Sequence, residues 1–488
     1  MSRSQPLLRC EIRKMLRVDQ ERFCAAVETM MRPNAHGDPR SSEYFRVAGY
    51  HGWPGNYCNH GIESFPAWHR AYLVEFESAL QAADRANGYD GNISLPYWDW
   101  TDTDQPEMFP AIIRQRFPQL NSDLFPDNNE LKQKGYLINS DQYIRLMILG
   151  AALSQQCNEA VAHPQHFQAA SHEYTQGYSL EDPHDSIHVY CGYPMSVVQF
   201  AAFHPIFFLH HCNLDRLYET HLATNPHAQA EFQSHEWSRL LRDIGAANVQ
   251  RAKSCLAPLE LPKLNDMNRP KTLYELPLIP FKHPVTGLDM MPKDCFDTIS
   301  LGYAYDRLTS IPPQQLQAPL IWAVFRGVDV AGKLASVSYT VFVFVVRKRF
   351  EQQWTPPQPK LEALLQSHNL AGITAIFGAK GEGCDNCMKR RKPITLKVNI
   401  SQALSDQGIS RHQAGLRVIA MDHHHQFFLL ESTAIPQPMI EGPYFSHSWL
   451  LLRQGAIPGV PEAVLEGEVL QLQKFLKKHG YSWYHRIL

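Results

Sequence analysis

The segment Val47–Tyr72 reads VAGYHGWPGNYCNHGIESFPAWHRAY and holds three histidines, His51, His60 and His69, at intervals of nine residues. Neutral imidazole is a good ligand for copper, zinc and iron. Three imidazoles that leave one position open make a reactive metal site. Apolar residues recur at helical spacing over Phe65–Ala86, so we expect His69 near the start of a long helix. The segment predicts one metal site held by three histidines.

A second group of histidines lies further along the chain. His184 and His188 are four residues apart, so on a helix they share one face and can point at one ion. His211 lies in FHPIFFLHHCNLDRLY, another segment with helical spacing, and helix bundles often carry metal ligands in their cores. Each of these residues alone is compatible with an ordinary buried histidine. Three plus three at these spacings predict two metal ions that face each other.

The composition is that of a large globular protein and argues against several classes of function. The chain has 488 residues, of which 44% are hydrophobic, and a formal charge of −2. This balance argues against nucleic acid or a membrane surface as a partner. No segment has the roughly 20 consecutive apolar residues of a membrane-spanning helix. The first residues lack the pattern of a signal peptide, so we expect a cytoplasmic protein.

Two kinds of pattern divide the chain. Apolar residues recur at helical spacing in its first half, over Glu11–Arg32, Phe65–Ala86, Asp141–Leu153 and Pro205–Ala223. Residues 257–292 are rich in proline and polar turn residues, which is typical of a linker. Runs such as LIWAVFRGV and SVSYTVFVFVV then predict antiparallel strands. The predicted fold class is α+β multidomain, with a mainly helical metal domain followed by an antiparallel β-sandwich or barrel.

The histidine motifs resemble those of the type-3 copper proteins, which are the tyrosinases, catechol oxidases and molluscan-type haemocyanins. The matching motifs are C-x-H-G and F-P-x-W-H-R, then PYWDWT, then H-x3-H and FFLHH-x3-DRL. The resemblance covers nearly the whole chain and points most closely to fungal-type tyrosinase proenzymes. It implies two copper ions that bind O2 between them in a four-helix bundle. By motif match the ligands are His51, His60 and His69 for the first copper and His184, His188 and His211 for the second.

Two further residues match positions close to these ligands. Cys58 resembles the cysteine whose sulfur forms a thioether with the ring of the second ligand, here His60. An ordinary buried cysteine is the alternative. Asp215 lies one helical turn after His211, where we expect it to accept a hydrogen bond from a ligand imidazole and to fix its tautomer.

Two carboxylates flank the first ligand of the second site. Glu181 matches the glutamate that holds a water near the copper in tyrosinases, and Asp185 stands where many tyrosinases have asparagine. Together they are candidates to orient a water that takes the phenol proton. Equally, they are placed to stabilise a helix N-terminus. The chain departs from the family at His204, where an aspartate usually caps the helix of the third ligand; because histidine is a weaker cap, we expect different hydrogen bonding there.

The strand-rich region resembles the C-terminal domain of molluscan haemocyanins and of fungal-type proenzymes. In those proteins one apolar side chain lies over the coppers, and Phe377 matches it; the alternative is a phenylalanine of the sandwich core. Cys384 and Cys387 resemble a cysteine pair thought to help load copper, in line with the preference of Cu(I) for thiolates. The run of three histidines at residues 423–425 is interpreted as a solvated turn.

The resemblance also suggests where the domains end. The stretch GYAYD, Gly302–Asp306, looks like the tyrosine motif that closes the copper domain and packs against paired basic residues, here Arg13 and Lys14. We therefore expect a copper domain over residues 1–306 and a β domain, or lid, over residues 307–460. A terminal amphipathic helix and tail are expected over residues 461–488.

These matches imply a tyrosinase, an oxidoreductase that uses two copper ions and O2 to hydroxylate monophenols and to oxidise o-diphenols to o-quinones. The substrates would be small tyrosine- or dopa-like phenols, and the β domain would keep the enzyme latent. No nucleic-acid or membrane partner is expected, and self-association to a dimer or tetramer is compatible with the sequence. The alternatives are a catechol oxidase without monophenol activity, a haemocyanin-like reversible O2 carrier, and a dizinc hydrolase, against which the C-x-H motif argues.

Overall fold

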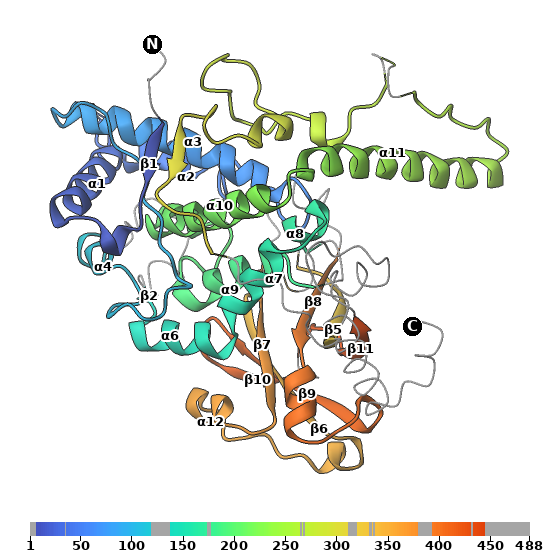
Figure 1. The fold of residues 1–488 in the computed structure, drawn as a ribbon. Coiled ribbons are helices and arrows are strands. Elements are labelled where there is room, and N and C mark those ends of the chain that lie inside the picture. The colour runs from blue at the N-terminus through green and yellow to red at the C-terminus, as the bar shows by residue number, and fades with distance from the viewer. Residues whose placement is uncertain are drawn as a thin grey trace, which may run out of the picture.

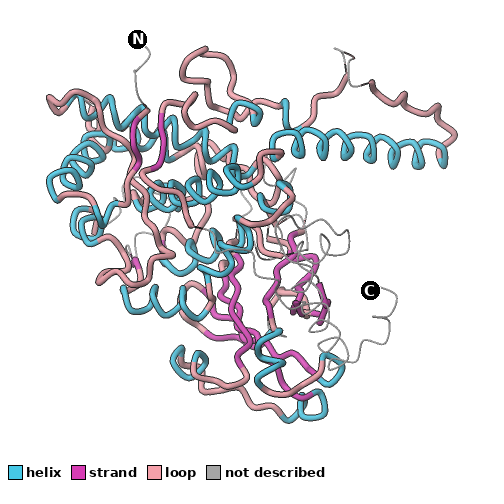
Figure 2. Tube along the Cα trace, in the orientation of Figure 1, coloured by secondary structure: helices cyan, strands magenta, loops and turns pink. Residues whose placement is uncertain are grey.

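A computed structural model of the chain describes residues 6–34, 36–118, 137–172, 177–263, 266, 269–310, 320–330, 334, 337–378, 393–430 and 433–444. Helices dominate its first part and two antiparallel sheets its last, which confirms the predicted α+β class (Figure 1). Figure 2 separates these parts, with only short strands among the helices. Cys384, Cys387 and the predicted terminal helix lie outside the described residues.

Three helices carry four of the six predicted ligands. Helix α3 (Phe65–Ala86) packs against α10 (Ile206–Thr224), and α10 packs against α9 (Glu181–Cys191) and α7 (Leu153–Val161). The sequence predicts the bounds of α3 because its signals are local: Pro66 lies in the first turn, and Gly88 follows the last turn with a positive φ. Most side chains of α3 are buried, so it is the central helix of the domain.

Shorter and peripheral helices surround this core. Their bounds are α1 (Arg17–Met30), α2 (Glu43–Ala48), α4 (Ala111–Arg116), α6 (Asp141–Gly150), α8 (His166–Ala170), α12 (Leu361–Leu365) and α14 (Ser401–Asp406). The predicted opening helix is in fact a 3₁₀ turn at Ile12–Lys14 followed by α1, because Met15 and Leu16 are extended. No described helix is both long and apolar enough to cross a membrane.

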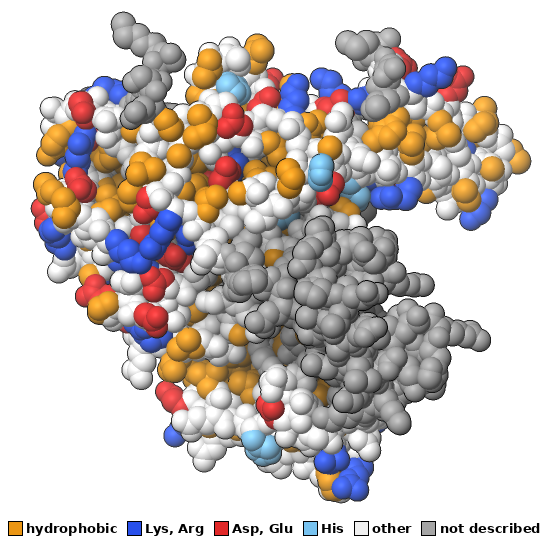
Figure 3. All heavy atoms as spheres, viewed as in Figure 1, with side chains coloured by type: hydrophobic (Ala, Val, Ile, Leu, Met, Phe, Trp, Pro, Cys, Tyr) orange, Lys and Arg blue, Asp and Glu red, His pale blue; other side chains and the backbone are white. Residues whose placement is uncertain are grey.

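Helix α11 (Ala228–Lys253) projects from the body of the molecule (Figure 1). The chain that follows runs back beside it, and Asn248 fixes the pair through hydrogen bonds in both directions with the backbone of Leu259. Hydrophobic side chains gather on the surface of this arm (Figure 3). Val249, Leu256 and Leu261 are among the exposed apolar residues there. Self-association stays a prediction.

The β part consists of two sheets that enclose a hydrophobic core. One sheet has the order β10-β9-β6-β7, formed by β10 (Phe427–Leu429), β9 (Ala414–Asp422), β6 (Tyr339–Arg347) and β7 (Leu370–Ile376). The other has the order β11-β5-β8, formed by β11 (Met439–Tyr444), β5 (Leu320–Val328) and β8 (Ile394–Asn399). All pairings within these sheets are antiparallel.

Strand β6 joins the two parts of the molecule. Val341, Val343 and Val345 belong to the core between the sheets, whereas Phe342 and Phe344 belong to the core of the helical part. Successive side chains of a strand point to opposite faces, so β6 is buried on both. This explains why its sequence is a continuous apolar run rather than an alternating one.

The sequence predicts a linker over the proline-rich residues 257–292. That prediction is wrong, because the second half of this stretch belongs to the core of the helical part. Leu278, Phe281 and Met290 are buried in the core, and the indole nitrogen of Trp68 donates to the carbonyl of Ile279 at 3.0 Å. Proline and turn residues report an irregular backbone, which here is buried rather than exposed. Beyond it, β4 (Tyr303–Tyr305) pairs in parallel with β1 (Leu7–Arg9).

Candidate metal centre

The first three histidines come together from a turn, a loop and a helix. His51 lies in the turn after α2, His60 in the loop before α3, and His69 in α3 itself. All three are buried, and their ring nitrogens approach within 4.8 Å of one another. Gly52 permits this turn, because a Cβ there would lie 2.3 Å from the carbonyl oxygen of Gln199. The histidines predicted for the first metal form one cluster.

The second group gathers on two facing helices. His184 and His188 lie on consecutive turns of α9, and His211 lies on α10. The Nε2 atoms of His188 and His211 are 3.2 Å apart. The two groups are also adjacent, since the rings of His69 and His211 stack with centroids 4.4 Å apart. The structure thus brings all six predicted ligands into one buried centre.

Four of these rings are oriented through their Nδ1 atoms. A neutral imidazole that donates its Nδ1 proton leaves the Nε2 lone pair for a metal. The Nδ1 contacts are His51 to Val198 O at 3.1 Å, His69 to Phe65 O at 2.9 Å, His188 to Met195 O at 2.9 Å and His184 to Asp185 Oδ1 at 2.8 Å. Val198 and Met195 lie in the loop between α9 and α10, so this loop anchors one ring of each group.

These rings fit copper ions. The Nε2 atoms of His69 and His184 are buried and have no hydrogen-bond partner among the described residues, which is costly unless another group meets them. Burial lowers the pKa of His69 to about 3 and that of His188 well below its usual value, so the rings are neutral and able to bind metal. A site of imidazoles with neutral ligand atoms suits copper.

His210 is a neighbour that the sequence reasoning set aside. Its ring nitrogens lie with those of His184, His188 and His211, all within 4.8 Å. Both are buried and without a hydrogen-bond partner among the described residues. The ring packs on that of His184, with centroids 5.3 Å apart. In the sequence, the double histidine of FFLHH was the feature that could have identified His210. In the structure, both of these histidines lie in the second group.

Asp215 does not contact a histidine, so the predicted hydrogen bond to a ligand is wrong. Its Oδ1 atom accepts from Arg70 Nε at 2.6 Å, and its Oδ2 atom accepts from Tyr303 and Tyr305 at 2.7 and 2.5 Å. Arg9 lies 3.3 Å from Oδ2. Although burial alone would raise it, these arginines hold the pKa of Asp215 below its usual value. Asp215 therefore ties α3, α10 and the pair β1–β4 together.

The same network corrects the predicted partners of the tyrosine motif. The Arg9 guanidinium lies over the ring of Tyr303, 3.4 Å from its centroid. Arg13 instead donates to the backbone carbonyl of Asp99 at 2.6 Å, and Lys14 pairs with Asp102 at 2.9 Å. The basic residue that meets the motif is Arg9, because β1 rather than the following turn pairs with β4.

Glu181 and Asp185 are both fully buried, and they contact backbone and histidine groups. Glu181 accepts from the backbone N–H of Gly61 at 2.7 Å and from that of His172 at 3.1 Å. It thus joins the loop of the first group to the helix of the second. Asp185 lies between His184 and His172. The role of these carboxylates towards a substrate water stays a prediction.

His172 is a second residue that the sequence reasoning missed. Its ring nitrogens face the carboxylates of Asp182 and Asp185. The carboxylate of Glu181 lies close enough to act on its charge. Burial alone would lower its pKa, but these carboxylates raise it well above the usual value. In return, although burial raises it, His172 holds the pKa of Asp182 at about 2. No local pattern pointed to this residue, because its partners are nine or more residues away.

His204 explains how α10 begins without the aspartate that usually caps this helix. Its Nδ1 atom accepts a hydrogen bond from the backbone N–H of Ile206 at 3.0 Å. Burial lowers the pKa of His204 well below its usual value, so the neutral ring has an acceptor nitrogen. The imidazole thus does what an aspartate oxygen would do at this position.

Phe377 lies against the second group of histidines. It follows β7, and its ring stacks on that of His188 with centroids 4.2 Å apart and an interplanar angle of 13°. It also approaches His60 and His184 edge-on. Phe377 packs with the core of the helical part and not with that of the sandwich. Cys58 is likewise buried, two residues from His60.

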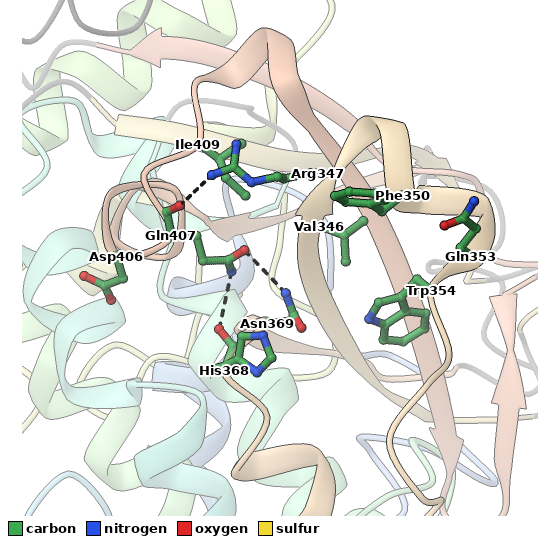
Figure 4. A pocket seen from close by; sticks show the side chains of 10 residues that line it. All are labelled: Val346, Arg347, Phe350, Gln353, Trp354, His368, Asn369, Asp406, Gln407 and Ile409. Atoms are coloured by element: carbon green, nitrogen blue, oxygen red, sulfur yellow. Dashed lines mark hydrogen bonds between the residues drawn. The ribbon is translucent and has the colours of Figure 1, made fainter.

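A separate cavity of about 690 Å³ lies in the β part. Phe350 and Trp354 line one side, and the amides of Asn369 and Gln407 the other (Figure 4). Arg347 donates to the backbone carbonyl of Gln407 at 3.4 Å. None of the clustered histidines lines this cavity, so it does not belong to the metal centre.

The model of a protein family described as the common central domain of tyrosinase matches residues 41–141 and 114–224. These ranges contain all six predicted ligands, from His51 to His211. The match rests on the part of the chain that carries both histidine groups.

Several relatives resemble the chain at low identity. Haemocyanin 2 of Megathura crenulata is 26% identical over 58% of the chain, and polyphenol oxidase 2 of Agaricus bisporus is 28% identical over 38%. A tyrosinase of Hahella sp. is 28% identical over 40% of the chain. The aligned regions cover 8%, 45% and 46% of these relatives. The haemocyanin, the polyphenol oxidase and the tyrosinase thus have comparable identities to the chain.

Solved structures share the fold across both parts of the molecule. A tyrosinase from Burkholderia thailandensis has a TM-score of 0.57 at 17% identity and covers 89% of this chain and 100% of that one. A functional unit of octopus haemocyanin has a TM-score of 0.53 at 18% identity, with 89% and 99% covered. Pro-tyrosinase of Aspergillus oryzae has a TM-score of 0.56 at 15% identity, with 87% and 91% covered.

Proposed function

We propose that this chain, as a member of the type-3 copper proteins, the family of tyrosinases and haemocyanins, is a copper-dependent phenol oxidase. His51, His60 and His69 would hold one copper, and His184, His188 and His211 the other. When bound, copper would let a monophenol and O2 give an o-quinone and water, and two o-diphenols and O2 give two o-quinones and two waters.

The observation that carries this proposal is the closeness of the two histidine groups. The ring of His69 from the first group stacks on that of His211 from the second, 4.4 Å apart. Two ions held by these groups would share one buried space, where a small molecule such as O2 can meet both. The surrounding residues would exclude bulk water and keep the rings in place through their Nδ1 contacts.

The β part would act as a lid over the centre. Phe377 covers the ring of His188, which is where a phenol would need to approach. The lid contacts the helical part close by, since Ser338 Oγ donates to the carbonyl of Ser196 at 2.6 Å. Further out, the backbone N–H of Asn399 donates to the hydroxyl of Tyr178 at 3.3 Å. Substrate access would require these contacts to open, which makes the enzyme latent as it stands.

Glu181 is the candidate to hold the water that takes the phenol proton. Its carboxylate is buried beside the loop of His60 and accepts two backbone hydrogen bonds. Those bonds fix the position of the carboxylate. Asp185 is less suited to this work, because its two oxygens already face His184 and His172.

A haemocyanin-like oxygen carrier is the second candidate. The observation that favours it is the same cover of Phe377 over the centre, since a lid that never opens would leave room for O2 but not for a phenol. A catechol oxidase is a narrower version of the first proposal, in which Asp185 replaces the asparagine common in tyrosinases.

Oxygen uptake separates these candidates. The copper-loaded protein is given a monophenol and then an o-diphenol, with His211→Ala as the matched control that lacks one ligand. Uptake with both substrates supports a tyrosinase, and uptake with the diphenol alone supports a catechol oxidase. Reversible oxygen binding without turnover of either substrate would overturn the proposed enzyme in favour of a carrier. The same result must then hold for Phe377→Ala, which removes the side chain that covers His188.

A further inference from the structure

The imidazole of His172 lies behind the second group of histidines and is completely buried. Its Nε2 atom is 3.1 Å from Oδ2 of Asp185, and its Nδ1 atom is 3.3 Å from Oδ1 of Asp182. The residue follows α8, outside the helices that carry the predicted ligands. Both of its nitrogens therefore face carboxylate oxygens.

Asp185 connects this imidazole to a copper ligand. Its Oδ1 atom accepts from Nδ1 of His184 at 2.8 Å, while its Oδ2 atom faces His172. Asp182 at the other end is fixed by Ser179, whose backbone N–H and hydroxyl donate to it at 2.6 and 2.7 Å. The groups form one buried chain in the order His184, Asp185, His172 and Asp182.

Charge explains why a histidine occupies this position. A ring nitrogen that faces a carboxylate oxygen carries a proton, so a histidine between two carboxylates carries both protons and a positive charge. A buried carboxylate without such a partner is strongly disfavoured. Without the His172 ring to hold its Oδ2 atom, the carboxylate of Asp185 would turn away from His184.

We propose that His172 is a positioning residue of the second copper site: its ring fixes the carboxylate of Asp185 in the orientation that accepts from Nδ1 of His184, so that the Nε2 atom of His184 stays available for copper. The inference rests on the proposed copper site but not on the oxidation of phenols. His172 faces Asp182 as well as Asp185. The ring provides a partner for a carboxylate at position 185, where many tyrosinases have an uncharged asparagine.

A double-mutant cycle on copper affinity tests the coupling. Cu(I) is titrated into the full-length apoprotein without oxygen, in competition with a chelator, for the wild type, His172→Gln, Asp185→Asn and the double variant. Loss of a residue behind a metal ligand lowers metal affinity by about 10- to 100-fold, so we expect His172→Gln to weaken one of the two copper sites by that factor. Asp185→Asn keeps an oxygen that can accept from His184, so its effect is expected to be smaller.

The double variant decides the proposal. Because the amides of the two substituted side chains can hydrogen-bond to each other, adding Asp185→Asn to His172→Gln is expected to restore affinity by about tenfold. If the two losses simply multiply, His172 serves only in packing and the proposal is overturned. If His172→Gln alone does not fold, recovery of folding in the double variant, measured by circular dichroism, supports the proposal, and its failure to recover overturns it.

A matched control separates the cost of replacing a buried histidine from this coupling. His221 is equally buried on α10, but its Nδ1 atom contacts the carbonyl of Val161 rather than a carboxylate. His221→Gln is expected to leave both copper affinities unchanged, and a drop as large as that of His172→Gln would overturn the proposal. Since no phenol is used, two tightly bound copper ions without oxidase activity would reject the proposed function and leave this inference intact.

Discussion

The two histidine groups are held by different chemistry. In the first group, the rings of His51 and His69 are oriented by backbone carbonyls. In the second, His188 is oriented by a carbonyl, but His184 is oriented by the carboxylate of Asp185. A carbonyl is fixed by the fold and survives side-chain substitution, whereas a carboxylate brings a charge that needs a partner. Side-chain substitutions can therefore change the orientation of a ligand more readily in the second group than in the first.

The largest effect is expected when one ligand is removed from either group. His60→Ala and His211→Ala should each abolish oxygen uptake and leave one copper per folded chain, because both ions are needed. Metal analysis and an oxygen electrode measure this, with the exposed His227→Ala as control. Full oxidase activity in either variant would show that the ligand assignment is wrong.

Asp215→Asn is expected to cause a large loss of stability without a selective loss of either copper ion. Asp215 pairs with buried Arg70 and Arg9, and breaking a buried pair typically costs about 3–5 kcal/mol. Chemical denaturation of the apoprotein measures the free energy of unfolding. A selective loss of the second copper at unchanged stability would instead support the hydrogen bond to a ligand that the sequence suggested.

Asp215 also shows where sequence reasoning ends. The helical bounds of Phe65–Ala86 and the strand LIWAVFRGV were predictable, because their signals lie within the segment itself. The ligand histidines were recognisable because spacing and flanking motifs are local too. The partner of Asp215 was not predictable, because the sequence shows His211 one helical turn away but does not show that Arg70 on another helix faces Asp215. His172 was missed for the same reason.

The domain ranges, the thioether at Cys58, the copper-loading role of Cys384 and Cys387, the location and the oligomeric state stay predictions. The linker prediction failed for a physical reason, since turn-forming residues determine backbone shape but not burial. Phe281 and Met290 are buried there because apolar side chains occur between the prolines.

A moderate gain is expected when the cover of the second group is removed. Phe377→Ala should raise the rate of phenol oxidation by the intact protein several-fold, because Phe377 stacks on the ring of His188. In the first group it approaches His60 less closely. Initial rates at saturating o-diphenol measure this, with the exposed Phe350→Ala as control on the same domain. An unchanged rate would reduce Phe377 to a packing residue.

The smallest effect is expected at the start of α10, the helix that brings His211 to the second group. His204→Ala removes the acceptor for the Ile206 N–H and should lower the free energy of unfolding by about 1 kcal/mol. His204→Asp supplies an oxygen acceptor and should retain the wild-type value. Thermal unfolding of the apoprotein measures both. If His204→Asp is as unstable as His204→Ala, the imidazole contributes through its packing rather than as a cap, and the helix of the second group starts without one.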